Sequence, residues 1–189
     1  MNKKLIFSAA LVLSLGLAGC GADSSKEDKP KEETKTTAST DKTADKEAKS
    51  DDVYFKDNEA KLESLKIKIT ETKVIKPGEK GNEHGEKPVF AIWYEATNLI
   101  DDGIDPTDAW FVVFTVIQDN NPNAINKLEV GTLPDERFRD TQLEKIKKDG
   151  TVENAIAYEL DDLETPVTLV ANQGLGGKEL GKQDYQIKQ

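Results

Sequence analysis

Short apolar runs with a period of two recur through residues 51–189. Over residues 65–70, leucine and isoleucine alternate with lysine and threonine. Such alternation is typical of a strand that buries one face and exposes the other. Residues 89–98 and 110–117 are apolar on both faces, as the central strands of a covered sheet are. The pattern therefore predicts β-strands in this part of the chain.

Five further segments have strand character. They are residues 53–55, 143–147, 152–160, 166–170 and 185–187. The Asp149-Gly150 pair is a hairpin signal, so we expect residues 143–147 to pair with residues 152–160. About seven or eight strands in one domain is the count expected for an immunoglobulin-like antiparallel β-sandwich. We therefore predict an all-β fold of that class for residues 51–189.

Residues 119–142 carry the weakest pattern in the domain. They contain Asn120, Asn121, Pro122 and Asn123, which favour turns. A plain loop of this length is unusual in a compact domain. We expect a short strand or a helical turn within it.

The first twenty residues have a different pattern. Lys3 and Lys4 precede a thirteen-residue apolar run over residues 5–17. That run has the length of a signal-peptide core and is too short to span a membrane as a helix. The sequence therefore predicts an export signal.

The apolar run ends in Leu17, Ala18, Gly19 and Cys20. This segment resembles the lipobox of bacterial lipoproteins. The resemblance implies that the Cys20 thiol receives a diacylglycerol, that a peptidase cuts before it, and that residues 1–19 are removed. The alternative is an ordinary secretory signal, but its A-x-A-like cleavage site is absent. Two acyl chains, such as palmitate, anchor a protein stably, whereas one binds only marginally. We expect a lipid-anchored protein on the outer face of a Gram-positive cell membrane.

Residues 20–50 form the predicted connection between this anchor and the domain. After the cysteine, the segment is rich in lysine, acidic residues and threonine, and it contains no aromatic residue, leucine, isoleucine, valine or methionine. It cannot bury enough apolar surface to offset the entropy of ordering. We predict a disordered charged linker.

The overall composition excludes several classes of function. The net charge is −10 and the pI is about 4.8, so nucleic-acid phosphates would repel the protein. One cysteine cannot form an internal disulfide, and one cysteine with one distant histidine cannot build a thiolate zinc site. We predict no nucleic-acid partner and no cofactor.

The best candidate for a metal site is the acidic loop that contains Asp101, Asp102, Asp105 and Asp108. Its four carboxylates could supply oxygen ligands to Ca²⁺, which takes six to eight of them. The EF-hand spacing and its bidentate glutamate are absent. A solvated loop of an acidic protein is the competing interpretation.

Other candidate residues have simpler interpretations. Asp161 and Asp162, with Glu159 and Glu164, could form an acid–base pair if a cleft separated their pKa values. Their place beside a turn favours an exposed corner. His84 lies in a glycine-containing loop and has no second histidine with which to share a metal. We interpret it as an exposed loop residue.

The two tryptophans could form a sugar-stacking platform if they pointed outward. Trp93 and Trp110 both lie in the most apolar runs, so packing in the core is the favoured interpretation. Gly174, Gly176 and Gly177 do not fit the spacing of a phosphate loop. They indicate a flexible connection between strands.

Several motifs resemble one known family. They are Tyr-Glu-Ala-Thr-Asn at residues 94–98, an apolar strand ending in Gln-Asp at residues 118–119, and Ala-Tyr-Glu-Leu-Asp-Asp at residues 157–162. In this order they are similar to a family of uncharacterised Gram-positive lipoproteins, domain of unknown function 5067. The resemblance covers roughly residues 53–187. It implies an extracellular immunoglobulin-like or telokin-like domain, and it carries no catalytic residues.

Two positions depart from that family. Residues 120–123 replace a short glycine turn, and Asp149-Gly150 replaces Pro-Gly. These differences concern loop shapes.

We expect a non-enzymatic, lipid-anchored binding or interaction module. The first alternative is an accessory or ligand-binding component of an envelope transporter or wall-assembly complex. The second is an envelope enzyme that uses carboxylate chemistry. Apart from the membrane lipid bound through Cys20, the sequence does not identify the protein or peptide partner of the module.

The lipobox predicts that Cys20→Ala releases the protein from the membrane or leaves it as uncut precursor, because no other side chain at that position can form the thioether. Metabolic labelling with a radioactive fatty acid measures this. The wild-type protein should carry label and the variant none. Absence of label on the wild-type protein would refute the anchor.

Overall fold

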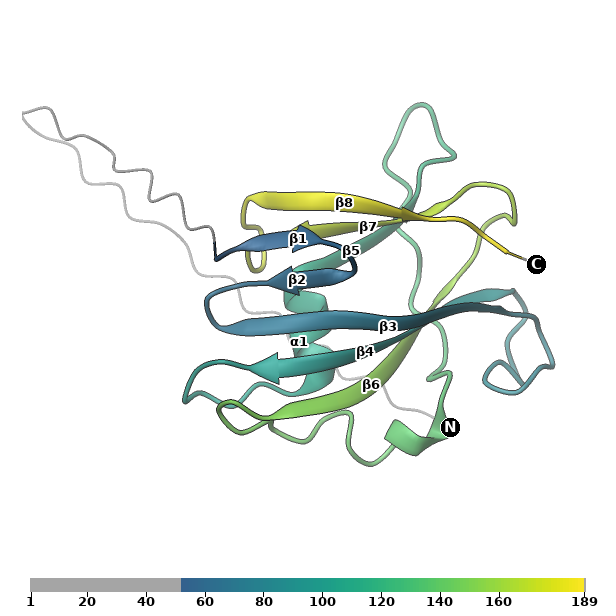
Figure 1. The fold of residues 1–189 in the computed structure, drawn as a ribbon. Coiled ribbons are helices and arrows are strands. Elements are labelled where there is room, and N and C mark those ends of the chain that lie inside the picture. Colours follow the sequence, from purple (N-terminus) through teal and green to yellow (C-terminus); the bar gives the residue numbers. More distant parts are fainter. Residues whose placement is uncertain (1–51, 189) are drawn as a thin grey trace, which may run out of the picture. The chain divides into compact units, whose positions relative to one another are not determined.

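The fold is described from a computed structural model that places residues 52–188. The predictions for residues 1–19 and 20–50, Cys20 included, lie outside the described residues. The described part consists mainly of antiparallel strands in two sheets (Figure 1). No helix within it combines the length and the apolar character needed to cross a membrane.

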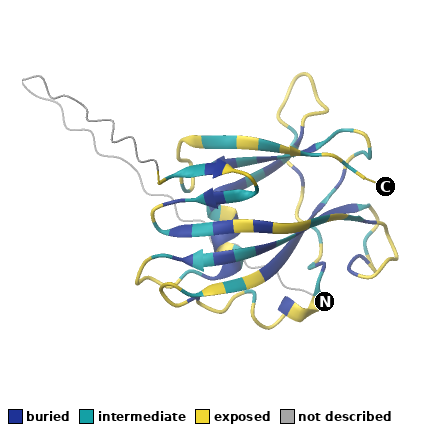
Figure 2. Ribbon diagram, viewed as in Figure 1, coloured by how far each residue is buried: buried dark blue, intermediate teal, exposed yellow. Residues whose placement is uncertain are grey.

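The first sheet has five strands in the order β1-β2-β3-β4-β6. Their bounds are β1 Tyr54–Lys56, β2 Glu59–Lys61, β3 Leu65–Ile75, β4 Val89–Asn98 and β6 Thr151–Glu159. The second sheet has the order β5-β7-β8, with β5 Phe114–Gln118, β7 Val167–Asn172 and β8 Glu179–Tyr185. The predicted all-β fold with antiparallel sheets in a sandwich-like arrangement is confirmed. Over residues 65–70 of β3, buried residues alternate with more exposed ones, as the sequence predicted (Figure 2). The strand then continues past a register shift to Ile75.

The core contains a short helix that the sequence pattern did not predict. Helix α1 (Pro106–Val113) lies behind the five-stranded sheet in Figure 1. Its Trp110 is fully buried, with ring centroids 4.7 Å from Tyr94 on β4 and 4.6 Å from Phe114 on β5. The helix thus fills the space between the sheets with aromatic side chains. Core packing of Trp110, predicted from the sequence, is confirmed.

The prediction of a strand over residues 110–117 is wrong for its first four residues. Asp105 is the N-cap of α1, and its Oδ1 accepts a hydrogen bond of 2.8 Å from the backbone N–H of Asp108. Pro106 occupies the first helical position, where its missing N–H costs nothing. This start signal overrides the strand preference of the apolar run. The strand begins only at Phe114, whose N–H closes the helix on the Trp110 carbonyl.

The predicted hairpin between residues 143–147 and 152–160 is also wrong. Strand β6 pairs with β4, from Val89 opposite Glu159 to Thr97 opposite Thr151. Residues 143–147 contribute only a single bridge, between Ile146 and Ile104. The Asp149-Gly150 turn instead borders the end of β4, because Asn98 exchanges backbone hydrogen bonds with both turn residues.

The edges of the sheets were predicted least well. Strand β2 was missed, although Asp57 and Asn58 both have positive φ and turn the β1–β2 hairpin. Strand β8 precedes the predicted residues 185–187 and shares only Tyr185 with them, since its polar sequence gives no apolar signal. The helical turn expected in residues 119–142 is present as the 3-10 turn η1 (Glu136–Phe138).

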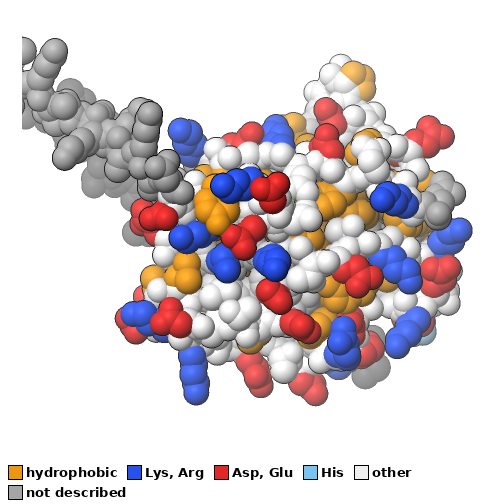
Figure 3. All heavy atoms as spheres, in the orientation of Figure 1, with side chains coloured by type: hydrophobic (Ala, Val, Ile, Leu, Met, Phe, Trp, Pro, Cys, Tyr) orange, Lys and Arg blue, Asp and Glu red, His pale blue; other side chains and the backbone are white. Residues whose placement is uncertain are grey.

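On the outer face of the five-stranded sheet, a small second cluster is buried, made of Ile75, Val89, Ala91 and Ala157 with the half-buried Trp93 beside it. The rest of this face is solvated. On it Lys68 lies opposite Glu95, and Lys66 lies 3.8 Å from Glu59. Figure 3 shows acidic and basic side chains interspersed over the face seen in Figure 1. Such mixed charge keeps a sheet face soluble and offers no extended surface of one sign.

The core geometry predicts a large cost for Trp110→Phe. The indole N–H of Trp110 donates to the buried hydroxyl of Tyr158 at 2.8 Å. The change leaves a void and removes this bond, so unfolding should become about 2–4 kcal/mol easier. Urea denaturation of the chain without residues 1–19 measures this. The matched control, Trp93→Phe, removes a half-buried indole and should cost clearly less. Equal losses would contradict the central role of Trp110.

Candidate functional site: an apolar groove beside helix α1

A groove opens at the end of the sandwich where β4 leads into α1. Its volume is about 510 Å³, within the range of ligand sites. It is lined by Ser64, Leu65, Asn98, Ile100, Asp102, Gly103, Ile104, Asp108, Phe111, Val112, Lys145 and Leu175. These residues come from the β2–β3 corner, the β4–α1 loop, α1, the segment before β6 and the β7–β8 hairpin. The groove is mainly apolar.

Three large apolar side chains at the groove are exposed to solvent. Ile100 is 40% exposed, Phe111 41% and Leu175 81%. Leu175 stands at the hairpin tip between Gly174 and Gly176, both with positive φ. Several exposed apolar residues around one concave surface are typical of an interaction site, whereas single ones are ordinary. The flexible strand connection expected at these glycines is the turn that presents Leu175.

The fully buried Asn98 holds the loop beside the groove. Its side-chain Nδ2 donates to the carbonyls of Asp102 at 3.0 Å and Ile146 at 2.9 Å. Its Oδ1 accepts from the backbone N–H of Ile100 at 3.1 Å. Satisfied buried amides fix a backbone conformation, since breaking them would leave polar groups without partners. The groove wall is therefore pre-organised.

An ion pair between a buried carboxylate and an exposed lysine fixes the other side of the loop. The carboxylate of Asp105 is almost fully buried and lies 2.7 Å from the Lys145 ammonium, which is also 3.6 Å from Asp108. Burial alone would raise the pKa of Asp105, but the bonds from Lys145 and from the Asp108 N–H hold that pKa below its usual value. The same bond to Asp105 raises the pKa of Lys145.

The predicted calcium loop lies at this groove, but its four carboxylates do not converge on one point. Asp105 and Asp108 both lie near Lys145. Asp101 lies 3.0 Å from Lys148, and Asp105 caps α1. Asp102 and Asp108 line the groove. Within residues 52–188 no three acidic, histidine or cysteine side chains are placed to share a metal ion. Calcium binding by Asp101, Asp102, Asp105 and Asp108 stays a prediction.

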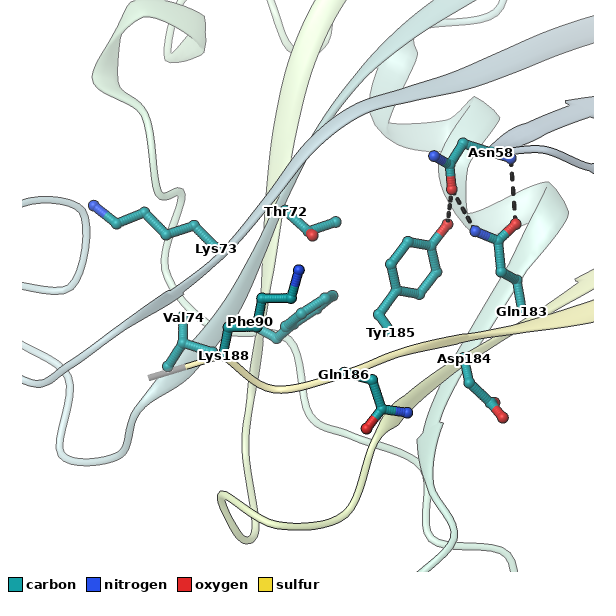
Figure 4. Close-up of a pocket in the computed structure, with 10 residues that line it drawn as sticks. All are labelled: Asn58, Thr72, Lys73, Val74, Phe90, Gln183, Asp184, Tyr185, Gln186 and Lys188. Carbon is teal, nitrogen blue, oxygen red and sulfur yellow. Dashed lines mark hydrogen bonds between the residues drawn. The ribbon is translucent and has the colours of Figure 1, made fainter.

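A second cavity, of about 400 Å³, lies between β8 and the strands β3 and β4 (Figure 4). There Asn58 Oδ1 accepts hydrogen bonds from the Tyr185 hydroxyl, at 2.8 Å, and from the Gln183 amide. The Asn58 N–H donates to Gln183 Oε1 at 3.2 Å. Burial raises the pKa of Tyr185. Because these polar groups bond to one another, we interpret the cluster as a clasp between the two sheets.

The predicted acidic corner is a structured turn. The Asp162 carboxylate accepts from the Asn120 amide and from the backbone N–H groups of Thr165 and Glu164, which lowers its pKa to about 2. Asp161 lies 3.4 Å from the Lys87 ammonium. The carboxylates therefore hold loops in place at the surface.

The predicted histidine and tryptophan sites do not line the groove. His84 is exposed, as expected. The prediction of core packing is wrong for Trp93. This side chain is half-buried on the outer face of the sheet, beside the small second cluster, and its indole N–H donates to Asp135 at 2.9 Å. The hydrogen bond from Arg137 is the main cause that lowers the pKa of Asp135, and the hydrogen bond from Trp93 lowers it further. Trp93 and Trp110 do not form a joint platform, because Trp110 lies in the core.

Sequence reasoning missed the residues that make the groove apolar. Ile100, Phe111 and Leu175 are distant in sequence, and Phe111 lay within a run interpreted as strand. Asp-Pro at residues 105–106, followed by an acidic residue at 108, was an available helix-start signal. With that helix, residues 110 and 111 fall on different faces, so only one of them enters the core.

Comparisons with known proteins bear on the family and the fold. The family model described as "Domain of unknown function (DUF5067)" matches residues 22–173. A structure described as a "putative lipoprotein" from Staphylococcus aureus subsp. aureus NCTC 8325 is similar, with a TM-score of 0.60 and 23% identity. The match covers 72% of this chain and 92% of that one.

A second structure, of the yjhA protein from Bacillus subtilis, has a TM-score of 0.42 and 14% identity over 64% of this chain and 82% of that one. No curated protein matches the chain. The resemblance stated from the motifs is confirmed by the family match, which begins at residue 22 and so includes most of the predicted linker.

Two explanations of stabilisation by ions can be separated at the acidic loop. Without residues 1–19, and so without Lys3 and Lys4, the chain has a net charge of −12. This charge should destabilise the compact state at low salt, so raising sodium chloride should raise the melting temperature by screening. We expect millimolar calcium to add little beyond sodium chloride at matched ionic strength, because Lys148 pairs with Asp101, Lys145 pairs with Asp105, and no three carboxylates of the described residues converge. Thermal melts of the chain without residues 1–19 measure this. A saturable calcium effect in high salt, lost when Asp101, Asp102 and Asp108 become asparagine, would establish the calcium site instead.

Proposed function

We propose that this chain, which belongs to the DUF5067 family, is a lipid-anchored, non-enzymatic binding module on the outer face of the cell membrane. The observation that carries the proposal is the pre-organised groove beside α1, with Ile100, Phe111 and Leu175 exposed around it. The lipobox at Cys20 supports the anchor. The description of the similar Staphylococcus aureus structure as a lipoprotein agrees with it.

The groove suits the capture of an apolar side chain from a partner protein. Covering a large apolar side chain contributes about 1.5–3 kcal/mol. Asn98 and the pair of Asp105 with Lys145 hold the wall in place before binding, so little ordering entropy is lost on complex formation. The open shape favours a protein segment over a small molecule, which usually binds in an enclosed cavity.

The two alternatives differ in what they require of this surface. An accessory component of an envelope transporter or wall-assembly complex would use the same groove to contact its neighbour, so this alternative specifies the partner further. An envelope enzyme with carboxylate chemistry has less support. Asp161 and Asp162 hold a turn, and Asp105 is bonded to Lys145.

Site-specific photo-crosslinking on intact cells tests the proposal. A photoreactive residue at position 175 should yield a discrete crosslinked species, because Leu175 lines the groove. The same residue at position 125 is the control, since Ile125 is 74% exposed in a different loop. Phe111→Ser should remove the species while leaving the melting temperature within a few degrees, because Phe111 is partly exposed.

The crosslinking experiment can also contradict the proposal. Position 175 would give no product, or the same products as position 125, and Phe111→Ser would change nothing. The groove would then have no partner at the cell surface.

A further inference from the structure

The mouth of the apolar groove carries negative charge. Asp102 and Asp108 both line it, and both are exposed. Asp102 forms no ion pair with any residue of the described chain, 52–188. Asp108 lies 3.6 Å from the Lys145 ammonium, and its side chain is 64% exposed. These two carboxylates are therefore available to a ligand.

The nearby lysines do not cancel this charge. The Lys145 ammonium lies 2.7 Å from the buried carboxylate of Asp105. The positive charge of Lys145 is therefore balanced by the negative charge of Asp105. Lys148 is matched in the same way by Asp101 at 3.0 Å. Counting Asp102, Asp105 and Asp108 against Lys145 leaves two uncompensated negative charges beside the apolar floor.

This charge discriminates between apolar ligands. An acyl chain with a carboxylate or phosphate head would place a further anion next to Asp102 and Asp108. A segment with a lysine or arginine beside its apolar side chain would place a cation there instead. Exposed ion pairs are individually weak, each changing affinity about two- to fivefold, but attraction in one case and repulsion in the other act in opposite directions.

We infer that the groove recognises a peptide segment of a partner protein in which a large apolar side chain stands next to a lysine or arginine. This inference rests on the proposed function, because it names the chemistry of the partner that the groove binds. The apolar side chain lies against Phe111 and Val112 under Leu175. The cation of the neighbouring residue meets Asp102 and Asp108 at the mouth.

Three blocked peptides test this by NMR titration of the chain without residues 1–19. The probes are acetyl-Gly-Phe-Arg-Gly-amide, the same peptide with Glu for Arg, and the same peptide with Gly for Phe. The Phe-Arg peptide should shift the amide signals of Ile100, Phe111 and Leu175. It should bind about tenfold more tightly than the Phe-Glu peptide at low salt. Moderate salt should reduce that ratio.

Matched variants assign the discrimination to the mouth of the groove. Asp102→Asn with Asp108→Asn should bring the affinities of the Phe-Arg and Phe-Glu peptides together. Asp119→Asn, at the opposite end of β5 from α1, should leave the tenfold ratio unchanged.

The outcomes separate this inference from the proposed function. Equal binding of the Phe-Arg and Phe-Glu peptides to the wild-type groove would overturn the inference and leave an apolar binding site. Equal binding of the Gly-Arg peptide would also overturn it, since the site would then be purely electrostatic. No shift of the groove amides with any phenylalanine peptide would overturn the proposed function as well.

Discussion

The carboxylate of Asp105 bonds to the backbone N–H of Asp108 and to the ammonium of Lys145, and both the core and the groove depend on the turn that these bonds hold. The cap starts α1 directly after the loop that leaves β4. One residue of that helix, Trp110, then enters the core, and the next, Phe111, stays at the surface. The cap stabilises the start of α1 by about 1 kcal/mol, and the helix that follows fills the space between the sheets. A single buried carboxylate thus connects the packing of the sandwich to the shape of its exposed groove.

The floor under α1 contains buried polar groups as well as apolar side chains. Asn154 donates to the hydroxyl of Tyr94 at 3.0 Å and to that of Thr107 at 3.4 Å, and the Tyr94 hydroxyl donates to the Pro106 carbonyl at 2.9 Å. Burial raises the pKa of Tyr158 to about 12, and its hydroxyl accepts the hydrogen bond of 2.8 Å from the Trp110 indole. Hydrogen bonds of this kind have defined directions, whereas apolar contacts alone do not, so they fix the rotation of α1 about its axis. That rotation decides that Phe111 points toward the groove.

The pattern of apolar residues predicted the strands that are buried on both faces or on alternate residues. It gave a wrong prediction where a local hydrogen bond starts a helix within an apolar run. The bounds of β4, Val89–Asn98, agree with the prediction because this segment is buried on both faces at its start and alternates afterwards, and no helix-start signal precedes it. Residues 110–113 resemble such a run, but the Asp105 cap redirects them into a helix. Strand β8 is polar and lies at the edge of its sheet, so its residues give no apolar signal. The groove could be predicted only through its acidic loop, because Ile100, Phe111 and Leu175 meet through tertiary structure and share no local motif.

The small size of the groove is consistent with an anchored protein. A soluble binding protein needs an extensive interface to overcome the loss of translational and rotational freedom on association. A domain held to the membrane by the lipid proposed at Cys20 would meet a partner on the same surface at a higher effective concentration than a protein free in solution would. Under that condition, one buried apolar side chain and one or two ion pairs are enough for useful occupancy. The same contacts would dissociate readily, so a groove of this kind suits reversible association between neighbours on a membrane.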